Sequence, residues 1–335
     1  MLIKTIKIIY FSILYKYHNN INLDFLAIVS GIILLSIGGD LLTRYSVELS
    51  YKLSIPKIII GMTIVSFATS APELIVSLNA TIMGYTDFAL GNVLGSNIAN
   101  LGLVLGIVVI IYPITIKRRF YYTDFPLLIL STAVFYLFIA SNSEISRIEG
   151  ILMLCLIFII LFYLFYYQKP DTSPLDKDLS LGEKKILKSS FLLILSAVIL
   201  WLGAETLIKS SISVANKFNV SERIISITMV AIGTSIPELA ASVAASLKKH
   251  NDLAIGNLIG SNIFNLLVVI GITSAINPIT GIDFDIISKD MIWVVAFSVL
   301  LLPLVYIQKR NKLNKIKGII LLAMYIAFII PLISN

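Results

Sequence analysis

The stretch Ala68–Leu74 reads Ala-Thr-Ser-Ala-Pro-Glu-Leu, and 165 residues later the stretch Gly233–Leu239 reads Gly-Thr-Ser-Ile-Pro-Glu-Leu. Each stretch interrupts a long apolar run with a proline and a glutamate. Proline has no backbone N–H and clashes with the carbonyl group four residues before it. We therefore expect Pro72 and Pro237 to break their helices and to free a backbone carbonyl group in each, which must find another partner at membrane depth.

The similarity extends well beyond these two stretches. Residues Thr63–Gly106 align without a gap onto Thr228–Gly271, with 21 identical residues at 44 positions. Most of the identities are polar residues, glycine or proline, so they do not merely reflect shared apolar composition. Each half contains five apolar runs, and an odd number of membrane crossings inverts the second half relative to the first. This predicts an inverted-topology repeat, an arrangement common in secondary transporters, which place the substrate site where the repeats meet.

The composition places the chain in a membrane. Only 13% of its 335 residues are charged and 58% are hydrophobic, whereas soluble proteins carry about 25% charged and 45–50% apolar residues. The apolar runs are continuous, which favours helices over the alternating strands of a β-barrel. We expect an all-α polytopic membrane protein with ten transmembrane helices in two inverted five-helix repeats. The runs long enough to span a bilayer lie near residues 24–43, 57–83, 87–112, 124–141, 148–168, 186–208, 223–248, 252–275, 290–308 and 316–333.

The basic residues predict domain limits and orientation. Eighteen of the 26 Lys and Arg residues lie in the loops after odd-numbered helices or at the helix ends that border those loops, and basic loops stay in the cytoplasm. This places the chain in the cell membrane with both termini outside, and the net charge of +7 reflects these loops. Asp40 and Glu205 correspond at the same offset, and we expect them near the end of the first helix of each half, with a place on an ion path as the alternative. The predicted units are an interfacial or disordered leader (1–22), the first repeat (23–168), a cytoplasmic linker (169–185) and the second repeat (186–335).

The reactive side chains exclude several classes of function. Cys155 is the one cysteine, and His18 and His250 are the two histidines, so neither a disulfide framework nor a site of soft metal ligands is expected. No catalytic dyad is apparent, so we expect neither an enzyme nor a bound cofactor. The expected partners are the lipid bilayer and the transported ions, with no nucleic acid and no protein partner, and the chain is expected to be a monomer.

Glu73 and Glu238 are the most informative residues. A carboxylate at the centre of a bilayer costs several kcal/mol, and two related by the repeat imply a compensating cation. The alternative is a pair of protonated glutamates that hydrogen-bond between helices. On a continuous helix, hydroxyl-bearing residues would share the face of each glutamate: Thr69, Ser70 and Ser77 in the first half, and Thr234, Ser235 and Ser242 in the second.

A second pair of segments supplies further oxygen atoms. Gly91–Asn100 reads Gly-Asn-Val-Leu-Gly-Ser-Asn-Ile-Ala-Asn, and Gly256–Asn265 reads Gly-Asn-Leu-Ile-Gly-Ser-Asn-Ile-Phe-Asn. The glycine spacing allows close helix packing, which by itself explains the glycines. It does not explain the serine and asparagine four residues apart on one face, and these are the candidate ligands: Ser96, Asn100, Ser261 and Asn265. Sites made of oxygen ligands alone suit hard cations such as Ca²⁺ and Na⁺.

These paired segments resemble the two α-repeats of the sodium/calcium exchanger family, within the calcium:cation antiporter superfamily. The resemblance covers essentially the whole chain after the leader and implies a minimal, prokaryotic-type exchanger with ten helices, an outside N-terminus and alternating access by sliding of the first and sixth helices. It also implies a central Ca²⁺ site shared with Na⁺ sites. The ligands carried over by position are the carboxylates of Glu73 and Glu238, the backbone carbonyl groups of Thr69 and Thr234, the hydroxyl groups of Ser70, Ser96, Ser235 and Ser261, backbone groups near Ser66 and Ala231, and the side chain of Asn100 at the middle site.

Two positions depart from the family pattern. Ala68 replaces the usual glycine before Thr69, which is the milder change, and the other position is 265. Well-known members carry aspartate where this chain has Asn265, so two carboxylates remain, and two negative charges balance one Ca²⁺. Asparagine has the shape of a protonated aspartate, so Ca²⁺ binding is expected to survive. The substitution leaves the stoichiometry, the coupling ion and any K⁺ dependence open.

The sequence therefore predicts a secondary active antiporter that exchanges Ca²⁺ for Na⁺ at a central carboxylate site. An H⁺-coupled Ca²⁺/cation antiporter that uses the same glutamates is the alternative, and the hydroxyl-rich flanks favour Na⁺. An ion channel is the candidate from another class. The inverted repeat and the absence of a filter-like ring argue against it.

Overall fold

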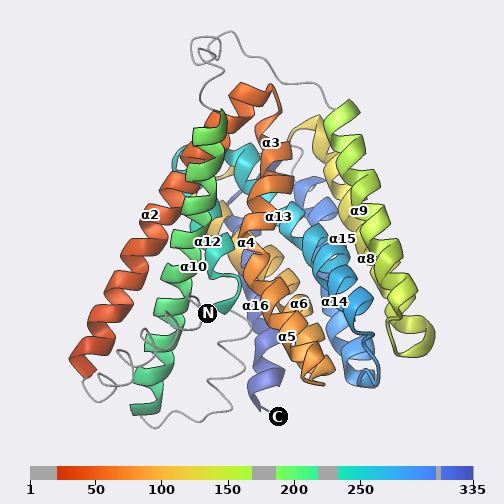
Figure 1. Ribbon diagram of the computed structural model, residues 1–335. Helices are drawn as coiled ribbons and strands as arrows, with labels where there is room; N and C mark the ends of the chain where they lie inside the picture. Colours follow the sequence, from red (N-terminus) through yellow and green to blue (C-terminus); the bar gives the residue numbers. More distant parts are fainter. Residues whose placement is uncertain (1–20, 168–185, 218–232, 307–310, 335) are drawn as a thin grey trace.

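The structure is a computed structural model that describes residues 21–167, 186–217, 233–306 and 311–334. Apolar runs in lipid must satisfy their backbone groups internally, which favours helices, and helices dominate the fold (Figure 1). Elements labelled η are π-type turns within longer helices. The first half contains α2 (Ile21–Leu53), α3 (Lys57–Ile60), η1 (Gly61–Val65), α4 (Ser66–Thr69), α5 (Ala71–Ile82), α6 (Thr86–Ala99), η2 (Asn100–Val104), α7 (Leu105–Ile111), β1 (Ile114–Thr115), η3 (Phe120–Asp124), α8 (Phe125–Asn142) and α9 (Arg147–Tyr167).

The second half repeats this order. Its described elements are α10 (Ile186–Lys217), α12 (Ile236–Leu247), α13 (Asn251–Phe264), η6 (Asn265–Val269), α14 (Ile270–Ile276), η7 (Ile286–Asp290), α15 (Met291–Tyr306), β2 (Lys312–Leu313) and α16 (Lys315–Ser334). The two short strands pair with each other in antiparallel fashion.

The described helices confirm a multi-pass, helical membrane protein. Eight of them are long and apolar enough to cross a membrane. Lys57–Thr69 and Ala71–Ile82, bent by 45° at their junction, would be a ninth if the pair counts as one broken span and not as a re-entrant loop. The predicted run 223–248 lies partly outside the described residues, and α12 is its described part. The predicted linker, 169–185, lies outside them, as does the leader up to residue 20. The count of ten spans therefore stays a prediction.

The local geometry of the two halves recurs at the offset seen in the sequence. α6 and α13 each have 14 residues, and each continues into a π-type turn that begins at an asparagine. The residue before α5, Ser70, has φ −86° and ψ 3°, and the residue before α12, Ser235, has φ −86° and ψ 2°. The shared Thr-Ser-x-Pro-Glu-Leu pattern thus produces the same turn twice.

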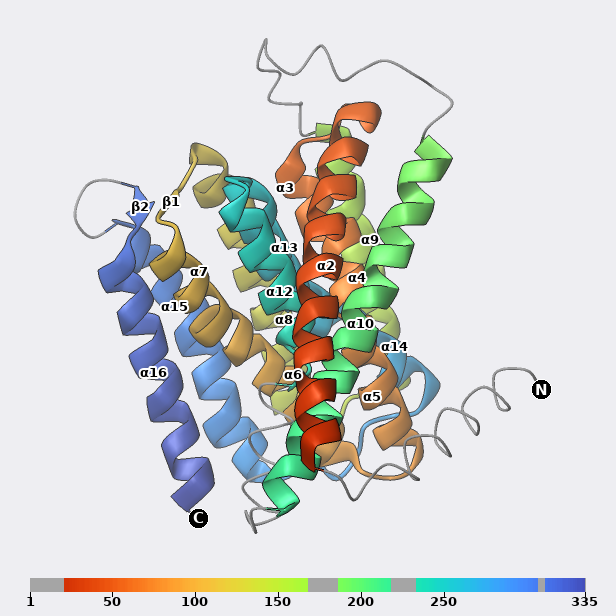
Figure 2. The same ribbon diagram turned by 90° about the vertical axis from the view of Figure 1, so that its left-hand side faces the viewer.

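The two halves are interlocked through their last helices. α7 of the first half packs against α16 of the second (Figure 2), and α14 of the second half packs against α9 of the first. A Cβ atom on Gly318 would lie 2.7 Å from the carbonyl oxygen of Gly106, and one on Gly150 would lie 2.8 Å from that of Gly271. Within a membrane, such close approach of small residues is a main source of helix association. Each half therefore completes the packing of the other.

α2 and α10 form a long pair along one side of the molecule (Figures 1 and 2). A Cβ atom on Gly31 would lie 3.0 Å from the carbonyl oxygen of Gly203, so the two backbones are in close contact. Towards the centre, α2 packs on α12, where a Cβ atom on Gly39 would lie 2.8 Å from the carbonyl oxygen of Ala240. The pair thus rests on the helix that carries Glu238.

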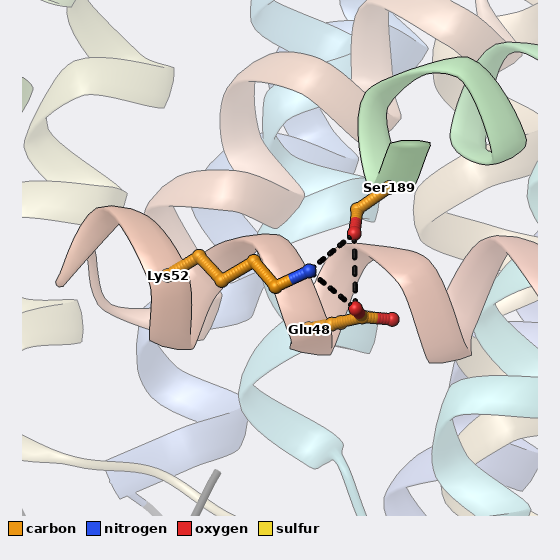
Figure 3. A network of polar contacts seen from close by, with 3 residues as sticks. All are labelled: Glu48, Lys52 and Ser189. Carbon is orange, nitrogen blue, oxygen red and sulfur yellow. Dashed lines mark hydrogen bonds and ion pairs between the residues drawn. The ribbon is translucent and has the colours of Figure 1, made fainter. Parts of the chain in front are cut away.

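A polar cluster joins the pair near one end. The Lys52 ammonium group donates to Glu48 Oε1 on the same helix (2.5 Å) and to Ser189 Oγ on α10 (2.7 Å). Ser189 in turn donates to Glu48 Oε1 (3.0 Å), which closes a triangle (Figure 3). The ion pair here lies within α2, and the serine makes the link between the helices.

A second cluster joins the opposite ends of the same two helices. Lys217 Nζ of α10 donates to Asp24 Oδ2 of α2 (2.6 Å), and Ser213 Oγ donates to the same oxygen (2.9 Å). These three residues correspond at the offset of 165 to the members of the first cluster, but the carboxylate and the serine have exchanged places. As a result, the ion pair here runs between the helices.

The expectation that Asp40 and Glu205 lie near helix ends is wrong. α2 continues to Leu53 and α10 to Lys217, because the polar residues beyond the predicted ends remain helical and form the two clusters. Asp40 pairs with Lys248 and Glu205 with Lys209, each at 2.5 Å.

We expect Asp24→Asn to lower the melting temperature of the detergent-solubilised protein. Lys217 would keep its charge at a site with 26% side-chain exposure without its carboxylate, and hydrogen bonds to charged groups contribute about 1.5–3 kcal/mol. Asp285→Asn is the control, since Asp285 pairs with Lys289 four residues away and both side chains are more than half exposed, where an ion pair contributes little. Equal losses in the two variants would show that the Asp24 pair does not hold α2 to α10.

Candidate ion-binding site

Both candidate carboxylates lie in the first turn of a helix that follows a break. α5 begins directly after Ser70 and α12 directly after Ser235, and each helix has a proline in its first turn, where the missing N–H costs no helical hydrogen bond. Glu73 and Glu238 follow these prolines. The partial positive charge at a helix N-terminus stabilises a nearby carboxylate, so the broken helices place each carboxylate where its charge is favoured.

Side chains from both halves surround the carboxylates. Ser96 Oγ donates to Glu73 Oε1 (3.1 Å) and lies 3.2 Å from Ser235 Oγ of the second half. Ser70 Oγ of the first half donates to Glu238 Oε1 (3.2 Å). Both glutamates are fully buried. The site therefore lies between the halves.

The segment before the first break packs closely on α13. Thr69 Oγ1 lies 3.3 Å from Ser261 Oγ and 3.2 Å from Asn257 Oδ1, and both Thr69 and Ser261 also face the Glu238 carboxylate. Ser66 Oγ donates to the carbonyl oxygen of Asn257 (2.9 Å). A Cβ atom on Gly260 would lie 2.3 Å from Ser66 Oγ. The glycine is thus required for the approach that brings these hydroxyl groups to the glutamate.

Several buried oxygen atoms of this region have no hydrogen-bond partner among the described residues. They are Glu73 Oε2, Glu238 Oε2, Asn92 Oδ1, Asn100 Oδ1 and Asn265 Oδ1. A buried polar atom left unpaired costs about 1–3 kcal/mol, and more if it is charged. These oxygen atoms are acceptors, so a bound cation is one ligand that could satisfy them, whereas Asn100 Nδ2, which is also unpaired among the described residues, is a donor.

The two asparagines lie on turns that contact the glutamate-bearing helices. η2, which begins at Asn100, packs against α12, and η6, which begins at Asn265, packs against α5. No group of three or more His, Cys, Asp or Glu side chains that could hold a metal ion occurs in the described part of the chain. The donor set is therefore two carboxylates with amide and hydroxyl oxygens, the chemistry that Ca²⁺ and Na⁺ prefer over softer metals.

The structure brings most of the predicted ligands together, with some differences. Asn100 is fully buried and Thr234 is partly buried in the turn before α12, whereas Ala231 lies outside the described residues. The expected single helix face that carries Thr69, Ser70 and Glu73 is wrong. Because the helix breaks at Ser70, Thr69 ends α4 while Glu73 belongs to α5.

Other polar residues of the site escaped the sequence reasoning. Asn92 Nδ2 donates to Ser77 Oγ and Asn257 Nδ2 donates to Ser242 Oγ, each at 3.0 Å. These two contacts are equivalent at the offset of 165 and tie each glutamate-bearing helix to the helix after it. Asn97 also belongs to the site, through its contact with Asn265. The sequence signal that could have identified these asparagines is that uncharged polar residues occupy matching positions in both apolar repeats.

Comparison with known proteins agrees with this geometry. A family model described as sodium/calcium exchanger protein matches residues 23–166 and 188–333. The chain is 36% identical to a protein named CaxA from Alkalimonas amylolytica, over 92% of this chain and 98% of the relative. It is 34% identical to inner membrane protein YrbG of Escherichia coli, over 75% of this chain and 79% of the relative. It is 28% identical to the sodium/calcium exchanger MaX1 of Methanosarcina acetivorans, over 93% of this chain and 99% of the relative.

A solved structure shows the same fold. The sodium-calcium exchanger NCX_Mj, soaked with 10 mM Na⁺ and zero Ca²⁺, superposes with a TM-score of 0.79 at 28% sequence identity, over 92% of this chain and 99% of that one. The resemblance inferred from the paired segments is confirmed by the family match, the full-length relatives and this structure. The chain belongs to the sodium/calcium exchanger family and is a multi-pass membrane antiporter for cations.

Proposed function

We propose that the protein exchanges Ca²⁺ for Na⁺ across the membrane by alternating access at a site centred on Glu73 and Glu238. The observation that carries this proposal is that each of these fully buried carboxylates keeps one oxygen without a partner among the described residues. Two such oxygens, with those of Asn100 and Asn265, fit a divalent cation in charge and in ligand chemistry.

The remaining oxygen atoms, which are uncharged hydroxyl groups, fit a monovalent cation. Ser96 and Ser235 form a hydroxyl pair beside Glu73, and Ser70 and Ser261 lie beside Glu238. We assign these pairs to flanking Na⁺ positions, with backbone groups near Ser66 on one side and near Ala231 on the other. The backbone carbonyl groups of Thr69 and Thr234 are assigned to Ca²⁺. The printed names of MaX1 and NCX_Mj, both sodium/calcium exchangers, support Na⁺ as the counter-ion.

Coupling follows from the charge of the site. When neither Ca²⁺ nor Na⁺ is bound, two buried carboxylates remain uncompensated in a medium of low dielectric constant, which is unfavourable by several kcal/mol for each charge. That cost raises the barrier to movement of the empty site across the membrane. Bound Ca²⁺ or Na⁺ removes it, so the loaded protein moves and the two ions exchange.

The proposed membrane arrangement has ten helices in two inverted five-helix repeats, residues 23–168 and 186–335. Residues 1–22 form a leader and residues 169–185 a cytoplasmic linker. The concentration of Lys and Arg in the loops after odd-numbered helices supports a cytoplasmic position for those loops. Both termini would then lie outside the cell membrane.

Glu73→Gln and Glu238→Gln should each abolish Ca²⁺ uptake by proteoliposomes driven by an outward Na⁺ gradient, because each removes one of the two charges that balance Ca²⁺. Glu144→Gln, at an exposed loop position, is the matched control and should keep wild-type flux. Retained Na⁺-driven flux in either site variant would refute the carboxylate site. Uptake by the wild type that follows a pH gradient and ignores Na⁺ would replace Na⁺ by H⁺ as the coupling ion.

The same two variants should differ from the wild type in stability. In the absence of Ca²⁺ and Na⁺, we expect Glu73→Gln and Glu238→Gln to melt at the same or a higher temperature than the wild type, because each removes a buried charge that lacks a full set of partners. Ca²⁺ should raise the melting temperature of the wild type, since a ligand that binds only the folded state stabilises it, and should not raise that of the variants. A thermal shift assay in detergent measures both effects. Stabilisation of either variant by Ca²⁺ to the wild-type extent would contradict the assignment.

A further inference from the structure

The side chain of Asn97 makes an oriented contact with Asn265. Asn97 is buried in α6, and its Nδ2 donates to the backbone carbonyl oxygen of Asn262 (3.3 Å). Its Oδ1 accepts from Asn265 Nδ2 (3.0 Å). A backbone carbonyl oxygen is only an acceptor, so it requires the NH₂ group of Asn97 to face it. The amide oxygen of Asn97 must then face residue 265.

This orientation demands a donor at position 265. Asn265 meets the demand with its NH₂ group, which also donates to Ser96 Oγ (3.2 Å). Its own oxygen, Oδ1, is left without a partner among the described residues. An ionised carboxylate in this place would put an acceptor against an acceptor, and the desolvation cost of a charged group left unpaired is larger than that of a neutral one.

The equivalent residues of the other half do not make this contact. Asn262, which corresponds to Asn97, donates within its own helix to the carbonyl oxygen of Leu258 (2.8 Å). Asn100, which corresponds to Asn265, has no hydrogen-bond partner for either amide atom among the described residues. The arrangement around Asn97 is therefore specific to one half and does not follow from the repeat.

We propose that Asn97 is a positioning residue whose amide oxygen requires a neutral hydrogen-bond donor at position 265. The ion site then contains two negative charges, and Asn265 presents its uncharged oxygen to the cargo. The role of that oxygen towards the ion rests on the proposed function. The orientation of Asn265 by Asn97 does not.

A double-mutant cycle tests the contact. Asn265→Asp alone should lower the melting temperature of the full-length protein in detergent without Ca²⁺ or Na⁺, because a carboxylate then faces the Asn97 oxygen. Asn97→Ser supplies a hydroxyl group that can donate to a carboxylate, so the double variant Asn97→Ser/Asn265→Asp should recover much of the loss. Neighbouring residues in such cycles couple measurably, whereas independent ones add.

The mirror-related pair provides the matched control. Asn262→Ser with Asn100→Asp makes the same chemical changes at the equivalent positions, where no hydrogen bond joins the two side chains. The effects of these two substitutions on the melting temperature should therefore add. If the two cycles show the same coupling, or if Asn265→Asp is as stable as the wild type, the proposed role of Asn97 is wrong.

Ion preference gives a readout that a purely structural role would not change. A third carboxylate attracts a divalent ion more than a monovalent one, so the ratio of the half-saturating Na⁺ to Ca²⁺ concentrations for Ca²⁺ uptake should rise in Asn97→Ser/Asn265→Asp. It should change much less in Asn265→Asp alone, where Asn97 opposes the charge. A full rise in the single variant would overturn the proposal. If the wild type carries no Na⁺-driven Ca²⁺ flux, the proposed function fails, and the melting cycle still decides the role of Asn97.

Discussion

The rest of the structure depends on the complete burial of two carboxylates. Glu73 and Glu238 are each buried completely, yet each has one oxygen with no partner among the described residues. Helix breaks make this possible, because they bring each carboxylate to the positive end of a helix and let hydroxyl groups of the other half approach it. Each carboxylate is therefore partly satisfied by the protein and keeps one oxygen free of protein partners among the described residues.

Close backbone contacts hold the two halves in register around this site. Gly260 admits Ser66, and the glycine pairs at the α7–α16 and α14–α9 contacts let each half pack its helices on the other. Apolar side chains gain little by meeting one another instead of lipid, so such contacts stabilise a membrane protein through close packing. Gly260, one of the glycines of the repeated segments, thus lets Ser66 approach α13.

The repeat supplies equivalent positions, and the chain uses some of them unequally. The clusters at the two ends of the α2–α10 pair exchange a carboxylate for a serine, so only the Asp24–Lys217 ion pair runs between the helices. In the buried region between the halves, Asn265 Nδ2 donates to Asn97 Oδ1, whereas neither amide atom of Asn100 has a hydrogen-bond partner among the described residues. The repeat determines which positions of the two halves lie close together. Single substitutions at those positions then determine which hydrogen bonds and ion pairs form there.

The sequence by itself determined the membrane class, the two repeats, the family and the two central glutamates, because these depend on hydropathy, on local proline chemistry and on matches at a fixed offset. It did not determine the lengths of α2 and α10, since Glu48, Lys52 and Lys217 look like loop residues until their partners on the facing helix are known. It also gave Asn92, Asn97 and Asn257 no role, and it placed Thr69 and Glu73 on one helix. Only the tertiary structure decided these points, because hydrogen bonds between residues far apart in the chain depend on how the helices pack.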